Sequence, residues 1–370
     1  MKDKKSQKLI VIKVGSSSLT DKSGKLDMKN LKRIAEEISK LKEEGKKVIL
    51  VSSGAIVTGA EKLGLVGKIK TIPQKQAAAA VGQSILMRDY EKVFAEHKIN
   101  IGQVLLTRDA IADRERYINA RNTFNELLEL GTIPIVNEND TVSIDEIKVG
   151  DNDNLSALVA SLVGADILIM LTDVDGFYME SESGEPFLVQ EIKEITPEIK
   201  NAAGHPSTQL GTGGMKTKIQ AAETANDAGI PVKIIHGRKK GLIEQALKEE
   251  KVGTTFIPKI SKPESRKRWL AHGHPSAGVI EVDGGAESAL TKHGGSLLAV
   301  GITKVEGDFK QGDSISIKDN AGREVARGLA NYSSNDIEKI KGLKTKQIEE
   351  VLGYKASAEV VHRDNMVLME

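Results

Sequence analysis

The sequence contains no cysteine, which excludes disulfide bonds, thiolate metal ligands and a thiol nucleophile. Long apolar runs are also missing. The longest, such as residues 9–14 and 167–171, are far shorter than the ~20 residues that a membrane-spanning helix requires. The N-terminus is basic but has no small-residue cleavage site, and its apolar run leads into a glycine turn, which predicts a first strand rather than a signal peptide. We expect a cytoplasmic protein without a membrane segment.

An excess of charge of one sign is missing as well, since 53 Lys and Arg residues face 52 Asp and Glu residues. Counted by segment, residues 1–257 hold 36 basic and 36 acidic side chains, residues 258–278 hold 5 and 1, and residues 279–370 hold 12 and 15. Binding to nucleic-acid phosphates requires a basic surplus on one face or in one domain. The C-terminal segment has a net charge of −3, so we expect no nucleic-acid partner.

The remaining composition is that of an ordinary globular chain, with 39% hydrophobic and 28% charged residues. A length of 370 residues predicts about two domains, because single hydrophobic cores rarely grow beyond roughly 250 to 300 residues. The seven histidines show no metal-ligand spacing, so we assign no protein ligand to a metal.

Up to residue 257, short apolar runs alternate with helical periods, the pattern of a parallel sheet covered by helices. We predict strands at residues 9–14, 48–53, 101–106, 133–137, 166–172 and 231–236. Helices are expected at residues 31–41, 120–130, 154–163 and 215–228. The sequence therefore predicts an α/β domain over residues 1–257 with a large, open, mainly parallel sheet.

After residue 257 the pattern changes. Residues 258–278 contain three prolines and a basic cluster, which is typical of a linker. From residue 279 to 370, short alternating segments are separated by glycine turns, which predicts a compact β-rich domain.

Two groups of polar or small residues follow the first two predicted strands. Lys13 lies within an otherwise apolar strand, where its ammonium could meet an anion at the strand end. A lysine that extends its charge to solvent from an edge strand is the alternative interpretation. Ser53, the last residue of the second predicted strand, and Gly54 after it are small, which lets backbone N–H groups approach a carboxylate or phosphate. A tight strand-to-helix turn would explain them equally well.

A third group is rich in carboxylates and amides and covers residues 137–140 and 151–154. The eight residues of these two runs exceed what turns need, so we expect a site that binds an ammonium group or an ion. Asp153 or Asn154 could instead serve as the N-cap of the following helix.

The fourth group, residues 211–218, is a glycine-rich turn that opens a helix and carries two lysines. Free backbone N–H groups, the positive helix end and the lysines together favour an anion. The spacing does not match a P-loop. Together with Lys13 and with Thr172 and Asp173, this group predicts nucleotide phosphates held by lysines and backbone.

Seven motifs, in order, carry a closer resemblance: IKVGSSSL, VSSGAI, LLTRDAIADRERYINARNTF, PIVNENDTVS, KVGDNDNLSALVA, LTDVDGFY and GTGGMKTKIQAA. The chain resembles the bacterial glutamate 5-kinases of the amino acid kinase family over nearly its whole length. From about Val279 it resembles the PUA domain. The resemblance implies an αβα sandwich, then a small PUA domain, and an enzyme that phosphorylates the γ-carboxylate of L-glutamate with ATP and Mg²⁺, the first step of proline biosynthesis.

The resemblance also assigns residues. It implies that ATP is bound by Lys13, Thr172, Asp173, Thr212, Gly213, Gly214, Met215, Lys216, Thr217 and Lys218, and glutamate by Ser53, Asp140 and Asn152. We expect Asp140 to meet the α-ammonium group, and Asn152 with the turn at Ser53 to hold a carboxylate. The family implies feedback inhibition by L-proline and a homo-oligomer, a dimer or a tetramer.

The chemistry of the reaction agrees with these motifs. A γ-carboxylate with a reference pKa of about 4.3 is already ionised at neutral pH and needs no general base. The catalytic task is to neutralise the charge of the transferred phosphoryl group. We therefore hypothesise that Lys13 and Lys218 bridge the β- and γ-phosphates and that Asp153 organises the lysines or magnesium. Two alternatives stay open: a related kinase for another small carboxylate or carbamate, and a PUA-containing RNA-binding protein.

Overall fold

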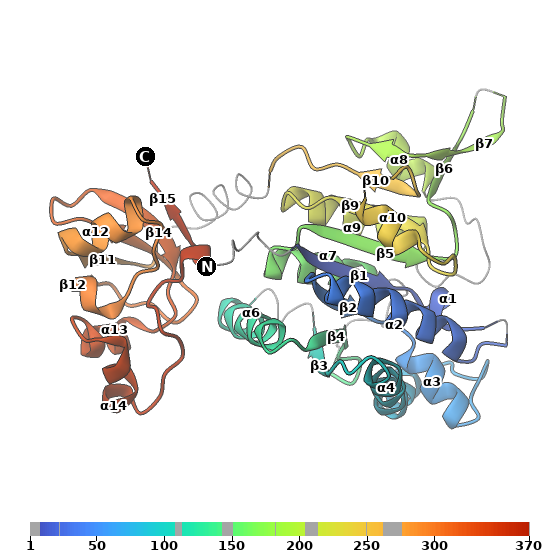
Figure 1. Cartoon of the computed structure of the whole chain (residues 1–370), viewed down its shortest axis with the longest axis horizontal. Helices are drawn as coiled ribbons and strands as arrows, with labels where there is room; N and C mark the ends of the chain where they lie inside the picture. The colour runs from blue at the N-terminus through green and yellow to red at the C-terminus, as the bar shows by residue number, and fades with distance from the viewer. Residues whose placement is uncertain are drawn as a thin grey trace. The chain divides into compact units, whose positions relative to one another are not determined.

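The computed structural model describes residues 8–21, 23–107, 113–142, 151–181, 183–203, 214–248, 250–261 and 276–369. The chain divides into two compact units (Figure 1). The first comprises Met1–Ile111 and Arg121–Lys262, and the second comprises Ala112–Ala120 and Pro263–Glu370. No helix in the described part of the chain is long and apolar enough to cross a membrane.

An eight-stranded sheet forms the centre of the first unit, in the order β3-β4-β2-β1-β5-β9-β10-β8. All strand pairs are parallel except β9 with β10. The strands are β1 (Leu9–Val14), β2 (Lys47–Val51), β3 (Ile101–Leu106), β4 (Ile133–Glu138), β5 (Ile167–Thr172), β8 (Glu191–Ile192), β9 (Val232–His236) and β10 (Thr254–Phe256). A hairpin of β6 (Phe177–Glu180) and β7 (Pro186–Val189) stands apart from this sheet.

Alternation along β1 explains how the sheet is covered. Ile10, Ile12 and Val14 belong to a core shared with α2 (Met28–Glu43), α4 (Ile72–Ala95) and α10 (Leu242–Leu247). Because successive side chains of a strand point to opposite faces, Lys13 lies on the other face. There α7 (Asp151–Val163) packs against β1 and β5, and α9 (Met215–Asp227) packs against α7 and β9. The unit is thus an αβα sandwich, as the resemblance implies.

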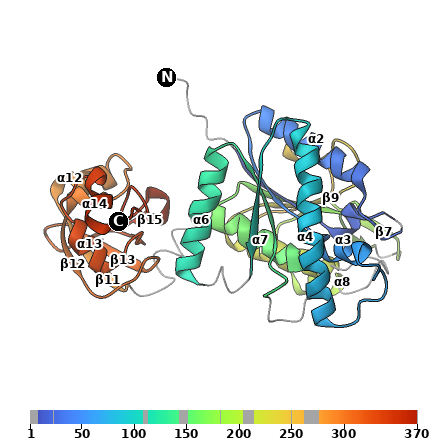
Figure 2. The ribbon, with the colours of Figure 1, turned by 90° about the horizontal axis from the view of Figure 1, so that it is seen from below.

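Helices α3 (Ala55–Lys62) and α4 lie against each other (Figure 2). The described residues before the C-terminal sheet also form α1 (Ser16–Leu19), α6 (Arg114–Glu129) and α8 (Pro197–Ala202). The residues of helix α6 are divided between the two units. Those up to Ala120 are assigned to the second unit, and those from Arg121 onward to the first.

The second unit contains a five-stranded sheet in the order β12-β11-β13-β14-β15. Its strands are β11 (Gly278–Val282), β12 (Ile302–Glu306), β13 (Ser314–Lys318), β14 (Glu324–Leu329) and β15 (Met366–Leu368). Apolar side chains such as Ile280, Ile315 and Ile317 are buried in its core. In the described residues from 276 onward, the sheet is accompanied by the α-helices α12 (Gly284–Thr291), α13 (Ser334–Ile340) and α14 (Ile348–Leu352). The predicted β-rich module is confirmed, although these helices were not predicted.

The mainly parallel sheet is confirmed, with three corrections. The expected second strand, 48–53, ends at Val51, because Ser52 and Ser53 form the turn into α3. The sheet also contains β8 and β10, which are too short to stand out as apolar runs. Helix α7 begins at Asp151 rather than at 154, so Asp153 lies inside its first turn and is not its N-cap.

Candidate active site

The carboxyl ends of the parallel strands bring the candidate residues to one edge of the sheet. Lys13 is the last residue but one of β1, and Thr172 is the last residue of β5, the neighbouring strand. Strand β2 flanks β1 on one side and β5 flanks it on the other, so the direction of the strand order changes at β1. In open α/β sheets such a point, beyond the carboxyl ends of the strands, is where ligands bind.

Lys13, Asp153 and Lys218 form a buried charge cluster at this edge. Lys13 Nζ lies 2.6 Å from Asp153 Oδ1, and Lys218 Nζ lies 3.2 Å from Asp153 Oδ2. Each of these residues comes from a different element, β1, α7 and α9, and none is more than 5% exposed. The hypothesis of a lysine that reaches solvent from an edge strand is therefore wrong, since β1 is central and Lys13 is buried.

The electrostatics of the cluster follow from burial and charge count. Burial lowers the pKa of Lys13, and the nearby ammonium of Lys218 acts in the same direction, whereas Asp153 opposes both. Burial alone would raise the pKa of Asp153, but the two lysines and hydrogen bonds outweigh it, so this pKa is lowered. One carboxylate thus faces two ammonium groups, which leaves the cluster ready to accept a further anion.

Thr217 connects the cluster to the start of α9. Its Oγ1 donates to Asp153 Oδ2 at 2.7 Å and lies 2.8 Å from the carbonyl oxygen of Gly214, the N-cap of α9. Met215 and Lys216 follow in the first turn, and the Lys216 side chain is exposed. Two further predicted residues, Thr212 and Gly213, lie outside the described residues. The part of the fourth motif that is described therefore opens a helix next to the lysines, as expected.

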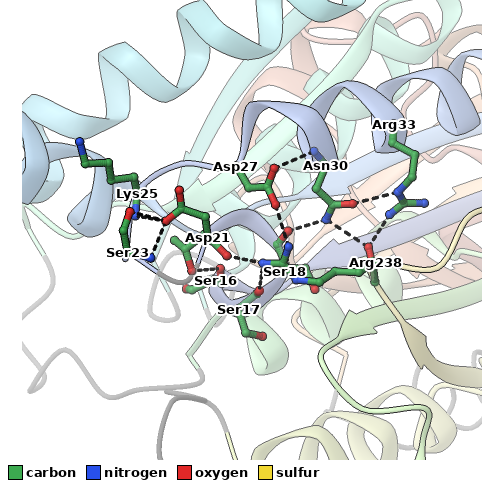
Figure 3. A network of polar contacts seen from close by, with 12 residues as sticks. Ser16, Ser17, Ser18, Asp21, Ser23, Lys25, Asp27, Asn30, Arg33 and Arg238 are labelled. Atoms are coloured by element: carbon green, nitrogen blue, oxygen red, sulfur yellow. Dashed lines mark hydrogen bonds and ion pairs between the residues drawn. The ribbon is translucent and has the colours of Figure 1, made fainter.

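The turn after Lys13 is anchored by an arginine from the loop after β9 (Figure 3). Arg238 donates from Nη1 to Asp27 Oδ2 at 2.7 Å and from Nη2 to the carbonyl oxygen of Ser17 at 2.9 Å. Asp27 is the N-cap of α2, where its other oxygen accepts from the backbone N–H of Asn30. The Asn30 amide in turn donates to the carbonyl oxygens of Ser18 and Gly237.

Close packing adds to this anchoring. Gly15 donates its N–H to the carbonyl oxygen of Leu171 in β5, and a Cβ at Gly15 would lie 3.3 Å from Lys13 Nζ. At Gly237 a Cβ would lie 2.3 Å from Ser18 Oγ, so a larger residue could not be accommodated without displacing the turn. Segments after β1, β5 and β9 are thus held together around the end of β1.

A second polar group lies next to the cluster and contains two of the predicted glutamate-binding residues. Asn152 Nδ2 donates to Ser53 Oγ and to Asn137 Oδ1, both at 3.1 Å. Asn137, at the end of β4, is almost fully buried and donates from Nδ2 to Gln83 Oε1 of α4 at 2.7 Å. Asn152 and Asp153 are adjacent in α7, so the amide group and the lysine cluster border one another.

Asp140 is half-buried in the loop after β4. Burial, with a contribution from the negative charge of Glu138, raises the pKa of Asp140 to about 6. A cationic ligand would stabilise the charged form of this carboxyl group.

Thr172 Oγ1 donates to Asp173 Oδ1 at 3.1 Å, so this predicted ATP-binding pair lies together at the end of β5.

The described residues contain no group of three or more His, Asp or Glu side chains arranged to hold a metal ion. Asp153, the most buried carboxylate, is already paired with two lysines. Mg²⁺ commonly binds to nucleotide phosphates together with one or two carboxylates and water, rather than to an all-protein cage. The site is therefore compatible with Mg²⁺ that arrives with a nucleotide.

Family models match both parts of the chain. Residues 8–236 match the model of the amino acid kinase family, and residues 278–352 match the PUA domain. The chain belongs to the amino acid kinase family. A protein named glutamate 5-kinase from Moorella thermoacetica is 51% identical over 362 residues, which cover 97% of this chain and 96% of the relative. Another glutamate 5-kinase, from Thermoanaerobacter sp., is 47% identical over 363 residues, or 98% of each chain.

A solved structure supports the fold of this family member. Carbamate kinase from Giardia lamblia bound to AMP-PNP aligns with a TM-score of 0.52 and 21% identity, covering 69% of this chain and 99% of that one. At this identity the likeness concerns the fold alone. The domain limits predicted at 257, 258–278 and 279 stay predictions.

Proposed function

We propose that this chain is a glutamate 5-kinase, which transfers the γ-phosphoryl group of ATP to the γ-carboxylate of L-glutamate and yields L-glutamyl 5-phosphate and ADP. The observation that carries the proposal is the pairing of full-length similarity to proteins of that name with the buried Lys13–Asp153–Lys218 cluster at the switch point of the sheet. The reaction is the first step of proline biosynthesis.

The reaction requires no proton transfer. The nucleophile is an ionised carboxylate oxygen that attacks the γ-phosphorus of ATP, and the bond between this phosphorus and the β–γ bridging oxygen breaks. Two anions must approach each other, and negative charge spreads over the transferred group. Positive charge that is fixed in advance in a dry site stabilises such a transition state.

Lys13 and Lys218 supply this charge in our proposal. Both are buried beside the same carboxylate, so their ammonium groups have a fixed separation before substrate binds. We assign them to the β- and γ-phosphates of ATP. Asp153 acts as a positioning residue that keeps both lysines charged and oriented, which explains why it accepts ion pairs on both of its oxygens.

The other assignments follow the position of each residue. Thr172 and Asp173 after β5, with the start of α9 from Gly214 to Lys218, would bind the nucleotide. Ser53, Asp140 and Asn152 would bind glutamate, Asp140 through the α-ammonium group. Mg²⁺ would be held chiefly by the phosphates and would supply additional neutralising charge.

We further propose a cytoplasmic enzyme that forms a homo-oligomer and is inhibited by L-proline, as the resemblance implies. The net charge of −3 over residues 279–370 argues against RNA binding dominated by phosphate contacts, and we expect this domain to pack or regulate instead.

Trapping the acyl phosphate tests the function. The purified chain is incubated with ATP, Mg²⁺ and hydroxylamine, together with L-glutamate or with a panel of other small carboxylic acids. We expect the γ-hydroxamate with glutamate. Product with a different acid and none with glutamate would instead support a related carboxylate kinase.

A further inference from the structure

A chain of hydrogen-bonded amide groups crosses the proposed glutamate site from α4 to α7. Gln83 Oε1 accepts from Asn137 Nδ2, and Asn137 Oδ1 accepts from Asn152 Nδ2. Asn152 Nδ2 also donates to Ser53 Oγ. Each hydrogen bond fixes the orientation of the next amide, so the free atoms at the two ends of the chain have defined chemistry.

One polar atom at each end of this series of amide groups remains to be considered. Gln83 Nε2 and Asn152 Oδ1 are buried and have no hydrogen-bond partner among the residues that the structure describes. Buried polar atoms in native proteins are nearly always satisfied, by protein, water or ligand. The first atom is a donor and the second is an acceptor. A substrate carboxylate, which accepts hydrogen bonds, is complementary to the donor, Gln83 Nε2.

The packing of two helices explains why Gln83 reaches this position. A Cβ at Gly82 would lie 1.8 Å from the carbonyl oxygen of Ala55, and a Cβ at Gly59 would lie 1.7 Å from that of Ala78. The backbones of α3 and α4 therefore approach to a distance that only glycine permits. Because α3 starts directly after Ser53 and Gly54, this approach brings Gln83, next to Gly82, to the site that Ser53 borders.

We propose that Gln83 is a further glutamate-binding residue, whose Nε2 donates to the α-carboxylate of the substrate. The inference rests on the proposed function. The γ-carboxylate must face the lysines beside Asp153, at the Asn152 end of the chain, whereas Gln83 lies at the opposite end, beyond Asn137. The amide nitrogen of Asn152 is already used by Ser53 and Asn137, so Gln83 supplies the amide donor.

Two substitutions separate this role from a merely structural one. Gln83→Ala removes both the bond to Asn137 and the free donor. Gln83→Glu keeps an oxygen for Asn137 Nδ2 but replaces the donor with a carboxylate that repels the substrate. Ser84→Ala is the matched control, because Ser84 is the exposed neighbour on α4 and its hydroxyl donates to the Val81 carbonyl oxygen.

Steady-state kinetics at pH 8 in the hydroxamate assay, with a melting curve for each variant, decide the matter. We expect both Gln83 variants to raise the KM for glutamate about ten-fold or more, the loss expected for one hydrogen bond to a charged group. The KM for ATP should stay near the parent value in all variants. A Gln83→Glu variant with a parental glutamate KM would overturn the donor role, even if Gln83→Ala is impaired.

Failure of the proposed function gives a different result. In that case the parent chain itself forms no hydroxamate from glutamate. If Gln83→Glu melts too low to assay, Gln83→Ala carries the test through the rise in melting temperature that saturating glutamate causes. This rise should be smaller than in the parent, and an equal rise would contradict the proposal.

Discussion

Lys13 Nζ and Asp153 Oδ1 lie 2.6 Å apart and both side chains are buried, and the second oxygen of the same carboxylate faces Lys218 Nζ at 3.2 Å. Two positive charges thus share one negative charge. We propose that the negative charges of ATP and glutamate neutralise the remaining positive charge of the cluster when the substrates bind.

Removal of either lysine should reduce turnover. We expect Lys13→Ala and Lys218→Ala each to lower kcat on the order of 10²-fold or more, because an electrostatic partner of the transferred phosphoryl group is lost. Lys13→Met keeps most of the apolar stem without the charge and should be as impaired as the alanine variant. Steady-state kcat at saturating substrates is the measurement. Near-normal turnover in both alanine variants would refute the role.

The effect of Asp153→Asn should depend on pH. Without the carboxylate, two buried ammonium groups face each other, and the pKa of Lys13, already lowered by burial, should fall further. A lysine is charged below its pKa, so kcat of the variant at saturating glutamate should recover as pH decreases from about 8.5 to 6.5. We also expect a loss of stability of about 3 kcal/mol, typical of a broken buried ion pair. A flat kcat profile would contradict this explanation.

The raised pKa of Asp140 should make the KM for glutamate depend on pH. Since the pKa of Asp140 in the free protein is raised to about 6, the carboxyl group becomes neutral below this pH and no longer attracts an ammonium group. The KM for glutamate should therefore rise as pH falls from 7.5 to 5.5. Asp140→Asn should raise this KM strongly at every pH and remove its dependence on pH, with little effect on the KM for ATP. Equal effects on the two KM values would contradict the assignment of Asp140 to the α-ammonium group of glutamate.

The stability of the Asp140→Asn variant should move in the opposite direction from its activity. A carboxyl group with a raised pKa in the folded state destabilises the protein at pH above its unfolded value. The variant should thus melt no lower than the parent at pH 7.5, and the difference should vanish near pH 4. A clear loss of melting temperature at pH 7.5 would point to a structural role for Asp140.

Arg238 provides a test of how the turn after Lys13 is positioned. Arg238→Ala removes the bonds to Asp27 and to the Ser17 carbonyl oxygen, so the turn should become less well fixed. We expect the KM for ATP to rise several-fold with little change in that for glutamate. Lys240→Ala is the control, since Lys240 is exposed in the same loop and forms no ion pair or hydrogen bond with the described residues. The same KM in both variants would exclude the role.

Strand β1 shows how much of the fold could be predicted from the sequence. Its bounds, 9–14, agree with the apolar run, because a central strand of a parallel sheet is buried on both faces. Helix α4 was not predicted. Its alanine-rich centre lacks a strong apolar stripe, and its main signal is local, a capping box of Thr71 and Gln74. Gly59 of α3 and Gly82 of α4 specify its position, because they let the two helices pack closely. This contact exists only in the folded chain.

The candidate site was predictable to a similar extent. Lys13, Asp153 and Lys218 each stand in a motif of unusual composition. The resemblance assigned the two lysines to the ATP site, and the role of Asp153 was a hypothesis from the chemistry of the reaction. That one carboxylate pairs with both lysines depends on the crossovers that place α7 and α9 on the same face of the sheet, which local sequence does not specify. Gln83 and Arg238 lie in no such motif. Their roles arise from hydrogen bonds to Asn137 and Ser17, which only the folded chain brings within reach.

The central claim is that a carboxylate oxygen of glutamate attacks the γ-phosphorus. It is tested most directly with L-glutamate that carries ¹⁸O in both γ-carboxylate positions. Hydroxylamine attacks the carbonyl carbon of the acyl phosphate, so the phosphate that it releases retains the attacking oxygen. Mass spectrometry of this phosphate should find one ¹⁸O atom per molecule. Phosphate without ¹⁸O, formed at the same rate, would mean that water attacks ATP and would contradict the account.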